Sequence, residues 1–167
     1  GKEWLNFSGH AKAQFLYFLA ENLHARKDEF AGRLIQMAQV SESDALSEVK
    51  ESISRLYTYA AYADKYDGKV HATTRNNVTL AMPEPIGILA ILCPEDFPLL
   101  GFISTVIPAI TMGNRVVVVP SEKHPFSATD LYQVLDTSDV PAGTINIITG
   151  NKDTLAAVLS KHDDVDG

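Results

Sequence analysis

The sequence has little cysteine, no long apolar run and no excess of basic residues. Its one cysteine excludes an internal disulfide and fits a reducing compartment, so we expect a cytoplasmic protein. The longest strong apolar run stops at Pro94, short of the roughly 18 residues that a membrane-spanning helix needs. With 21 acidic and 14 basic residues the formal net charge is -7, which argues against a nucleic-acid-binding surface.

The composition is that of a folded segment. Hydrophobic residues make up 46% of the sequence and charged residues 21%, which leaves no room for an extensive disordered tail. A chain of 167 residues can build one domain, or one and a fraction, around its own core. Because it begins with Gly-Lys and stops abruptly at 163–167, we expect a piece excised from a longer protein. The histidines show no metal-binding spacing, and a single cysteine excludes the common zinc sites, so no metal is expected.

Three amphipathic helices are predicted at the start of the chain. Apolar residues recur at helical spacing over 8–24, 28–40 and 41–65. The third segment opens at Ser41, and Asp44 follows three residues later in the pattern of a capping box.

The pattern then changes to a period of two, which predicts a β-hairpin. Segments 69–75 and 78–82 are rich in Val and Thr. Between them lie Asn76 and Asn77, and asparagine tolerates the left-handed backbone that a two-residue turn requires. We therefore expect two paired strands joined by a tight turn at these asparagines.

Strands and helices alternate in the second half of the chain. Short β-branched runs predict strands at 88–93, 116–119 and 145–149, and helical patterns predict helices at 98–112, 125–136 and 152–161. Such alternation indicates right-handed βαβ units. The predicted fold class is α/β, with N-terminal helices and a β-hairpin followed by half of a Rossmann-type parallel sheet made of three βα units. The corresponding divisions are a helical segment at 1–67, a hairpin at 68–85 and a partial dinucleotide-binding domain at 86–167.

The most informative segment is 88–98, where an apolar strand runs into Cys93-Pro94 and a loop with two adjacent acids. Doubly wound sheets bind ligands where the carboxyl end of a strand meets its loop. Five motifs stand in order: Glu-Pro-Ile-Gly at 84–87, Cys-Pro-Glu-Asp-Phe-Pro at 93–98, Gly-Asn-Arg-Val-Val-Val-Val-Pro-Ser-Glu at 113–122, Pro-Ala-Gly-Thr-Ile-Asn-Ile-Ile-Thr-Gly at 141–150 and His-Asp-Asp-Val-Asp at 162–166. In order and spacing they resemble the N-terminal part of the aldehyde dehydrogenase superfamily. The departures make the chain most similar to the degenerate second repeat of the two-repeat, family-16 aldehyde dehydrogenases.

The resemblance implies NAD(P)-dependent oxidation of aldehydes to acids, but the loop that would take part differs from the family pattern. Asp96 stands where the family uses an asparagine amide to stabilise an oxyanion. An ionised carboxylate has no proton to donate and repels the developing negative charge. Asp96 could stabilise an oxyanion only if it stayed protonated in an apolar pocket. The other interpretation is that Asp96 is a loop acid that caps the helix starting near Pro98. We therefore assign no catalytic residue to this segment.

The cofactor site that the resemblance implies keeps some residues and loses others. Pro94 and Glu122 match the family pattern, in which the acid binds the adenosine ribose and favours NAD over a 2′-phosphorylated cofactor. Val119 replaces a lysine that reaches the ribose, and Lys152 and Ala156 replace glycines that let the backbone approach the pyrophosphate. Glu122 is equally open to interpretation as a solvated loop acid. We expect NAD to bind weakly or not at all.

Cys93 does not stand at the family's nucleophile position, which falls beyond Gly167, and we expect it to be an inert core residue. The preferred interpretation is a non-catalytic, structural repeat, a pseudoenzyme segment. It would pack against a catalytic repeat of the parent chain or form a homo-oligomer such as a dimer. In one alternative, the segment is part of an active NAD-dependent aldehyde dehydrogenase whose catalytic cysteine lies beyond Gly167. Another is a regulatory module that binds a nucleotide without turnover.

Overall fold

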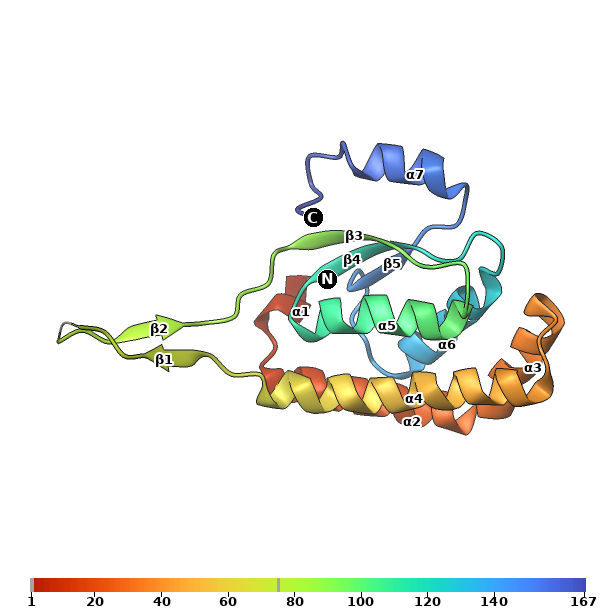
Figure 1. The fold of residues 1–167 in the computed structure, drawn as a ribbon, viewed down its shortest axis with the longest axis horizontal. Helices are drawn as coiled ribbons and strands as arrows, with labels where there is room; N and C mark the ends of the chain where they lie inside the picture. The colour runs from red at the N-terminus through yellow and green to blue at the C-terminus, as the bar shows by residue number, and fades with distance from the viewer. Residues whose placement is uncertain (1, 75) are drawn as a thin grey trace.

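The computed structural model describes residues 2–74 and 76–167, which form stacked layers of helices and sheet (Figure 1). The elements are α1 (Lys2–Asn6), α2 (Gly9–Ala25), α3 (Lys27–Ala38), α4 (Glu42–Lys65), β1 (Lys69–His71), β2 (Thr79–Ala81), β3 (Ile88–Leu92), α5 (Pro98–Thr111), β4 (Arg115–Val119), α6 (Phe126–Thr137), β5 (Ile145–Ile147) and α7 (Lys152–Leu159). Helices α2, α3 and α4 pack on α5 and α6, which cover one face of the sheet, and α7 lies on the opposite face. The predicted α/β class is confirmed.

The sheet is parallel, with strand order β3-β4-β5. Its register places Ile88 beside Arg115 and Val116 beside Ile145. Each strand is followed by a helix, so the three predicted βα units are confirmed. The chain end runs along the outer edge of β3, where the Asp166 backbone N–H donates to the Ile88 carbonyl at 2.8 Å.

The three predicted N-terminal helices are present within a few residues of their expected bounds. Ser41 caps α4, because its hydroxyl oxygen accepts a hydrogen bond from the Asp44 N–H at 3.2 Å. The apolar stripes meet in a shared core, in which Leu19, Leu34 and Leu56 are fully buried. Helical periodicity therefore identified the helices and most of their buried positions, although Phe18 and Leu46 on the same predicted stripes are exposed.

Helix α1 was absent from the sequence prediction. Its Trp4 is fully buried and packs against the rings of Phe7 and Phe15, with centroids 6.1 and 5.9 Å away. The indole Nε1–H donates to the Ile110 carbonyl at 2.9 Å, near the end of α5. A helix of five residues is too short to show a periodic pattern, so only its tertiary contacts reveal it.

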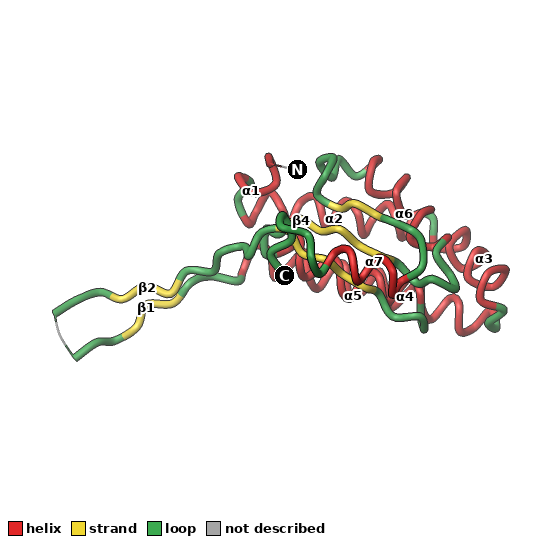
Figure 2. The backbone as a smooth tube through the Cα atoms, turned by 90° about the horizontal axis from the view of Figure 1, so that it is seen from above, coloured by secondary structure: helices red, strands yellow, loops and turns green. Residues whose placement is uncertain are grey.

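The hairpin of β1 and β2 projects away from the layers (Figures 1 and 2). The two strands pair antiparallel as a hairpin, with His71 opposite Thr79. A two-residue turn at the asparagines would place His71 opposite Met82, so the turn differs from the predicted one. The strands are exposed along their whole length, and no buried face selects one register over another. Arg75, the predicted end of the first strand, lies outside the described residues.

The N-terminus of α5 is capped by a side chain from the helical layer. Phe97 precedes this helix with φ 52° and ψ 64° and supplies no side-chain hydrogen bond. The interpretation of Asp96 as the cap is wrong, because another acid accepts the first N–H groups of the helix. Instead Glu48 of α4, only 7% exposed, accepts hydrogen bonds from the Leu99 N–H at 2.9 Å and the Leu100 N–H at 3.1 Å. Burial raises the pKa of Glu48, and the two N–H groups oppose that rise.

We predict that Glu48→Ala destabilises the fold by about 2 kcal/mol, because two helix N–H groups are then buried without an acceptor. Glu48→Gln keeps a side-chain oxygen and should cost less than about 1 kcal/mol. Urea denaturation measures both. Glu51→Ala, on an exposed position of the same helix, is the control. Equal effects of Glu48→Ala and Glu51→Ala would contradict the capping role.

Candidate functional site

The loops that follow the three parallel strands meet at one edge of the sheet. The loop at 93–97 follows β3, the loop at 120–125 follows β4, and 148–151 leads from β5 into α7. Parallel strands place all their carboxyl ends at the same edge, and this edge is where doubly wound folds bind ligands. The candidate site is therefore built from these loops.

Glu95 is the centre of this edge. Its carboxylate accepts hydrogen bonds from the Ser121 hydroxyl at 2.8 Å, the Lys123 N–H at 3.1 Å and the Glu122 N–H at 3.3 Å. It also forms an ion pair with the Lys152 ammonium. One side chain thus joins the loop after β3 to the loop after β4 and to the first turn of α7.

The Lys152 side chain extends from the first residue of α7 to the loop that follows β3. Its Nζ contacts Glu95 and donates a second hydrogen bond to the Cys93 carbonyl. The Lys152 side chain is 20% exposed and that of Glu95 is 30% exposed, so the pair is partly screened from water. Burial opposes ionisation of Glu95, but the hydrogen bonds from Lys152, Lys123 and Ser121 outweigh it and lower the pKa of Glu95 to about 2.

Glu122 is engaged at the N-terminus of α7. Its carboxylate accepts from the Lys152 backbone N–H at 2.8 Å and from the Asn151 amide at 3.2 Å. Asn151 is the N-cap, and its side-chain oxygen accepts from the Thr154 N–H at 3.0 Å. A helix N-terminus is a favourable place for an anion, and here a carboxylate of the chain itself takes that place.

Comparison with known proteins identifies the family. The profile of the aldehyde dehydrogenase family matches residues 1–167. The chain belongs to the aldehyde dehydrogenase family. It is 32% identical to rat aldehyde dehydrogenase 1A1 over 167 residues, 99% of the chain and 33% of that protein. It is 31% identical to an aldehyde dehydrogenase of Agaricus bisporus over 163 residues, 97% of the chain and 33% of that protein.

Solved structures agree with this assignment. An NAD-dependent aldehyde dehydrogenase from Sinorhizobium meliloti superposes with a TM-score of 0.92 at 26% identity, over 98% of this chain and 33% of that one. An NADP-dependent enzyme of E. coli superposes with a TM-score of 0.94 at 22% identity, over 98% and 34%, which supports the fold alone. The chain spans about a third of the length of the relatives that it matches.

The remaining predicted residues of this aldehyde dehydrogenase segment lie around the Glu95–Lys152 pair without joining it. Val119 is fully buried in the core, where its side chain offers no polar group. Asp96 is exposed, so the apolar pocket that a neutral acid needs is not formed around it. Pro94 lies over Gly101, where an added Cβ would come within 2.6 Å of the proline ring, and Ala156 is half-buried on α7.

Cys93 is buried at the end of the apolar strand. Its Sγ lies 3.5 Å from the Thr105 hydroxyl, and burial raises the pKa of the thiol. A thiol that is buried and protonated is a poor nucleophile. Among residues 2–74 and 76–167, no group of three His, Cys, Asp or Glu side chains is placed to hold a metal ion. Within the same residues, no helix is long and apolar enough to cross a membrane.

Glu95 and Glu48 are the important residues that the sequence analysis missed. The sequence analysis treats Glu95 only as one of two adjacent acids in the loop after the apolar strand. A signal for it existed, since Lys152, which replaces a family glycine, carries a charge complementary to that of Glu95. Glu48 offered no such signal, because a helix cap from an element 51 residues away leaves no local pattern.

We predict that Glu95→Gln destabilises the chain by about 1 kcal/mol at neutral pH, a value reduced because the ion pair is partly exposed. The pKa of Glu95 is lowered from 4.5 to about 2, so its contribution is present above pH 4.5 and is lost as the pH falls towards 2. Urea denaturation of both proteins from pH 7 to about pH 2 checks this. A stability difference that does not shrink on acidification would contradict the assignment.

Proposed function

We propose that this segment is a structural, non-catalytic part of an aldehyde dehydrogenase-like protein. The observation that carries the proposal is the Glu95–Lys152 ion pair at the carboxyl edge of the sheet. The family binds NAD(P) for the oxidation of aldehydes to acids, and the related structure from Sinorhizobium meliloti is NAD-dependent. The corresponding edge of this chain is occupied by its own side chains.

The residues at this edge do not fit a dinucleotide. A pyrophosphate at the N-terminus of α7 would have to displace the Glu122 carboxylate, which already accepts the Lys152 N–H. It would also meet the Lys152 side chain, which is held by Glu95 and the Cys93 carbonyl. Val119 supplies no donor for a ribose. These contacts support weak or absent binding of NAD.

A structural role requires a surface for a partner, and the hairpin of β1 and β2 offers one. Its side chains Val70, Val78, Leu80 and Met82 are at least 59% exposed. Exposed apolar strands with unpaired edges favour association with another chain or repeat. We propose that this hairpin packs against a catalytic repeat of the same protein or against a second copy, in an arrangement such as the two-repeat, family-16 aldehyde dehydrogenases imply. A cytoplasmic location stays a prediction from the single thiol.

One alternative is favoured by a specific observation. Glu122 retains its carboxylate at the position where the family binds the ribose, and it is exposed. If NAD displaced Asn151 and Lys152 from this carboxylate, the segment would belong to an active NAD-dependent aldehyde dehydrogenase with its catalytic cysteine beyond Gly167.

Two substitutions at Asp96 distinguish the two proposals in the intact protein. A non-catalytic segment predicts that Asp96→Asn and Asp96→Ala leave kcat for aldehyde oxidation within about twofold of the unmodified protein. An active segment predicts that restoring the amide donor in Asp96→Asn raises kcat by roughly 10²-fold or more, because one oxyanion donor contributes that much.

The control is Asp163→Asn, which removes the same charge from an exposed residue near the end of the segment. Stopped-flow or steady-state NADH formation with a simple aldehyde gives kcat and KM separately. A rise in kcat confined to Asp96→Asn would overturn the structural proposal.

A further inference from the structure

The outer edge of β5 is where the parallel sheet ends. On its inner side β5 pairs with β4, and the Ile148 N–H donates to the Val118 carbonyl at 2.9 Å. Backbone groups alternate in direction along a strand, so the Ile147 N–H and the Ile145 carbonyl point to the outer side. These two groups are the donor and the acceptor that an added strand would use.

Tyr132 of α6 binds both of these backbone groups. Its hydroxyl oxygen accepts a hydrogen bond from the Ile147 N–H at 3.2 Å, and the hydroxyl donates to the Ile145 carbonyl at 3.4 Å. One phenol thus takes the place of a neighbouring strand. Tyr132 is 43% exposed, so water could satisfy the same groups if the hydroxyl were absent. The specific consequence of the contact is that it excludes another strand.

Asp136 lies one helical turn after Tyr132 and places a charge beside the same edge. It is exposed and lines a hollow of about 240 Å³ next to β5, together with Leu135, Val140 and Pro141. Strand addition combines backbone hydrogen bonds with a pocket for a side chain, and this edge has both features. A charged side chain at an edge opposes such pairing. Within the part of the chain that the structure describes, Asp136 forms no ion pair that would neutralise it.

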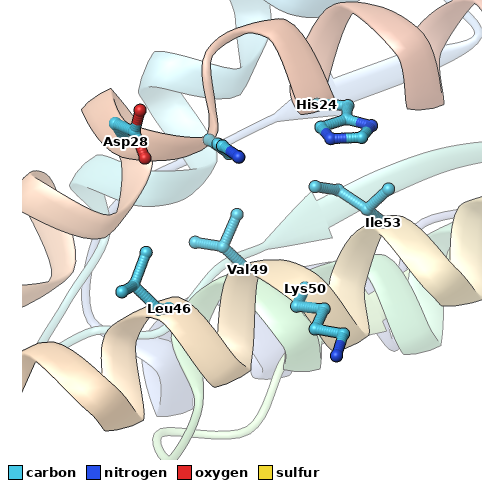
Figure 3. A pocket seen from close by; sticks show the side chains of 7 residues that line it. His24, Asp28, Leu46, Val49, Lys50 and Ile53 are labelled. Carbon is cyan, nitrogen blue, oxygen red and sulfur yellow. The ribbon is translucent and has the colours of Figure 1, made fainter.

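The groove between the α2–α3 junction and α4 lacks this combination. Its volume is about 500 Å³, and Leu46, Val49 and Ile53 of α4 line one side of it (Figure 3). Its walls are helical, so the backbone groups there are bonded within the helices themselves. An apolar wall of this kind does not select a strand.

The opposite edge of the sheet is covered by the end of the chain. The Asp166 N–H donates to the Ile88 carbonyl at 2.8 Å, and the Ala90 N–H donates to the Gly167 carbonyl at 2.7 Å. The Asp166 carboxylate also accepts the Ile88 N–H at 2.8 Å. Both edges of the sheet therefore have partners from the same chain, whereas the strands of the β1–β2 hairpin are exposed.

We propose that Tyr132 and Asp136 form an edge guard, which prevents β5 from pairing with β5 of a second copy of the chain. The hydroxyl engages the two outward backbone groups. Two copies brought edge to edge would also bring their Asp136 carboxylates together, because each lies beside its own β5. The guard goes beyond the structural role proposed above, since it determines which surface is closed to self-association.

Analytical ultracentrifugation of the intact protein tests the proposal. Tyr132→Phe with Asp136→Asn keeps the shapes of both side chains and removes the hydroxyl and the charge. This guard variant should grow beyond the assembly of the unmodified protein at concentrations at least about tenfold lower. The control, Tyr17→Phe with Glu21→Gln, makes the same changes at the same spacing on exposed positions of α2 and should stay within about twofold of the unmodified protein. Equal association of the guard variant and the control would overturn the proposal.

Hydrogen–deuterium exchange locates the new contact. In the guard variant, exchange of peptide 144–149 should slow as the protein concentration rises, because a second strand then protects the Ile147 N–H. Exchange that does not depend on concentration would contradict the proposal.

Tyr132→Lys with Asp136→Asn distinguishes strand pairing from a loss of stability. It removes the same hydroxyl but leaves a charge at the edge, so its peptide 144–149 should exchange quickly at every concentration and its association should not increase. Unfolding midpoints check that the variants stay folded. If the lysine variant associated as strongly as the guard variant, pairing at the β5 edge would not be the cause and the proposal would be wrong.

Discussion

The Glu95 carboxylate is the interaction on which the carboxyl edge of the sheet depends. It holds the N–H groups of the loop after β4 and the ammonium of Lys152 at the start of α7, so segments from three βα units share one acceptor. These segments are short and exposed to solvent on one side, and such loops need side-chain partners to satisfy their backbone groups. The edge is therefore ordered by an internal ion pair, in the place where a bound ligand would otherwise supply the charges.

Carboxylates of the chain satisfy the helix ends that face this edge. Glu48 accepts the first N–H groups of α5, and Glu122 accepts the first N–H group of α7. A helix N-terminus binds a phosphate because its N–H groups and dipole are available. In this chain, Glu48 accepts two N–H groups at the start of α5, and Glu122 accepts one at the start of α7. The fold of the aldehyde dehydrogenase family is retained. At the carboxyl edge of its sheet, acids of the chain contribute hydrogen bonds that stabilise the starts of two helices.

Much of the fold was predictable because its determinants are local. Helices α2, α3 and α4 follow from apolar residues at helical spacing, and β3, β4 and β5 follow from β-branched runs. The hairpin register was not predictable, since exposed strands lack a buried face that selects it. Glu48 and Glu95 were missed because each partner lies on another element, and Lys152 is 57 residues from Glu95. The motifs located the loops at the carboxyl edge of the sheet. The side-chain contacts between these loops depend on the tertiary structure, so the motifs did not reveal them.

The central claim is that NAD does not bind at the carboxyl edge of the sheet around Glu95. Hydrogen–deuterium exchange of the intact protein, with and without NAD, tests it directly because exchange is read peptide by peptide. The informative peptides are 119–124 and 150–156, which contain the groups that a dinucleotide would have to displace. The account predicts the same exchange in these peptides with and without NAD, whatever happens elsewhere in the protein. Saturable protection of both peptides by micromolar NAD would contradict it.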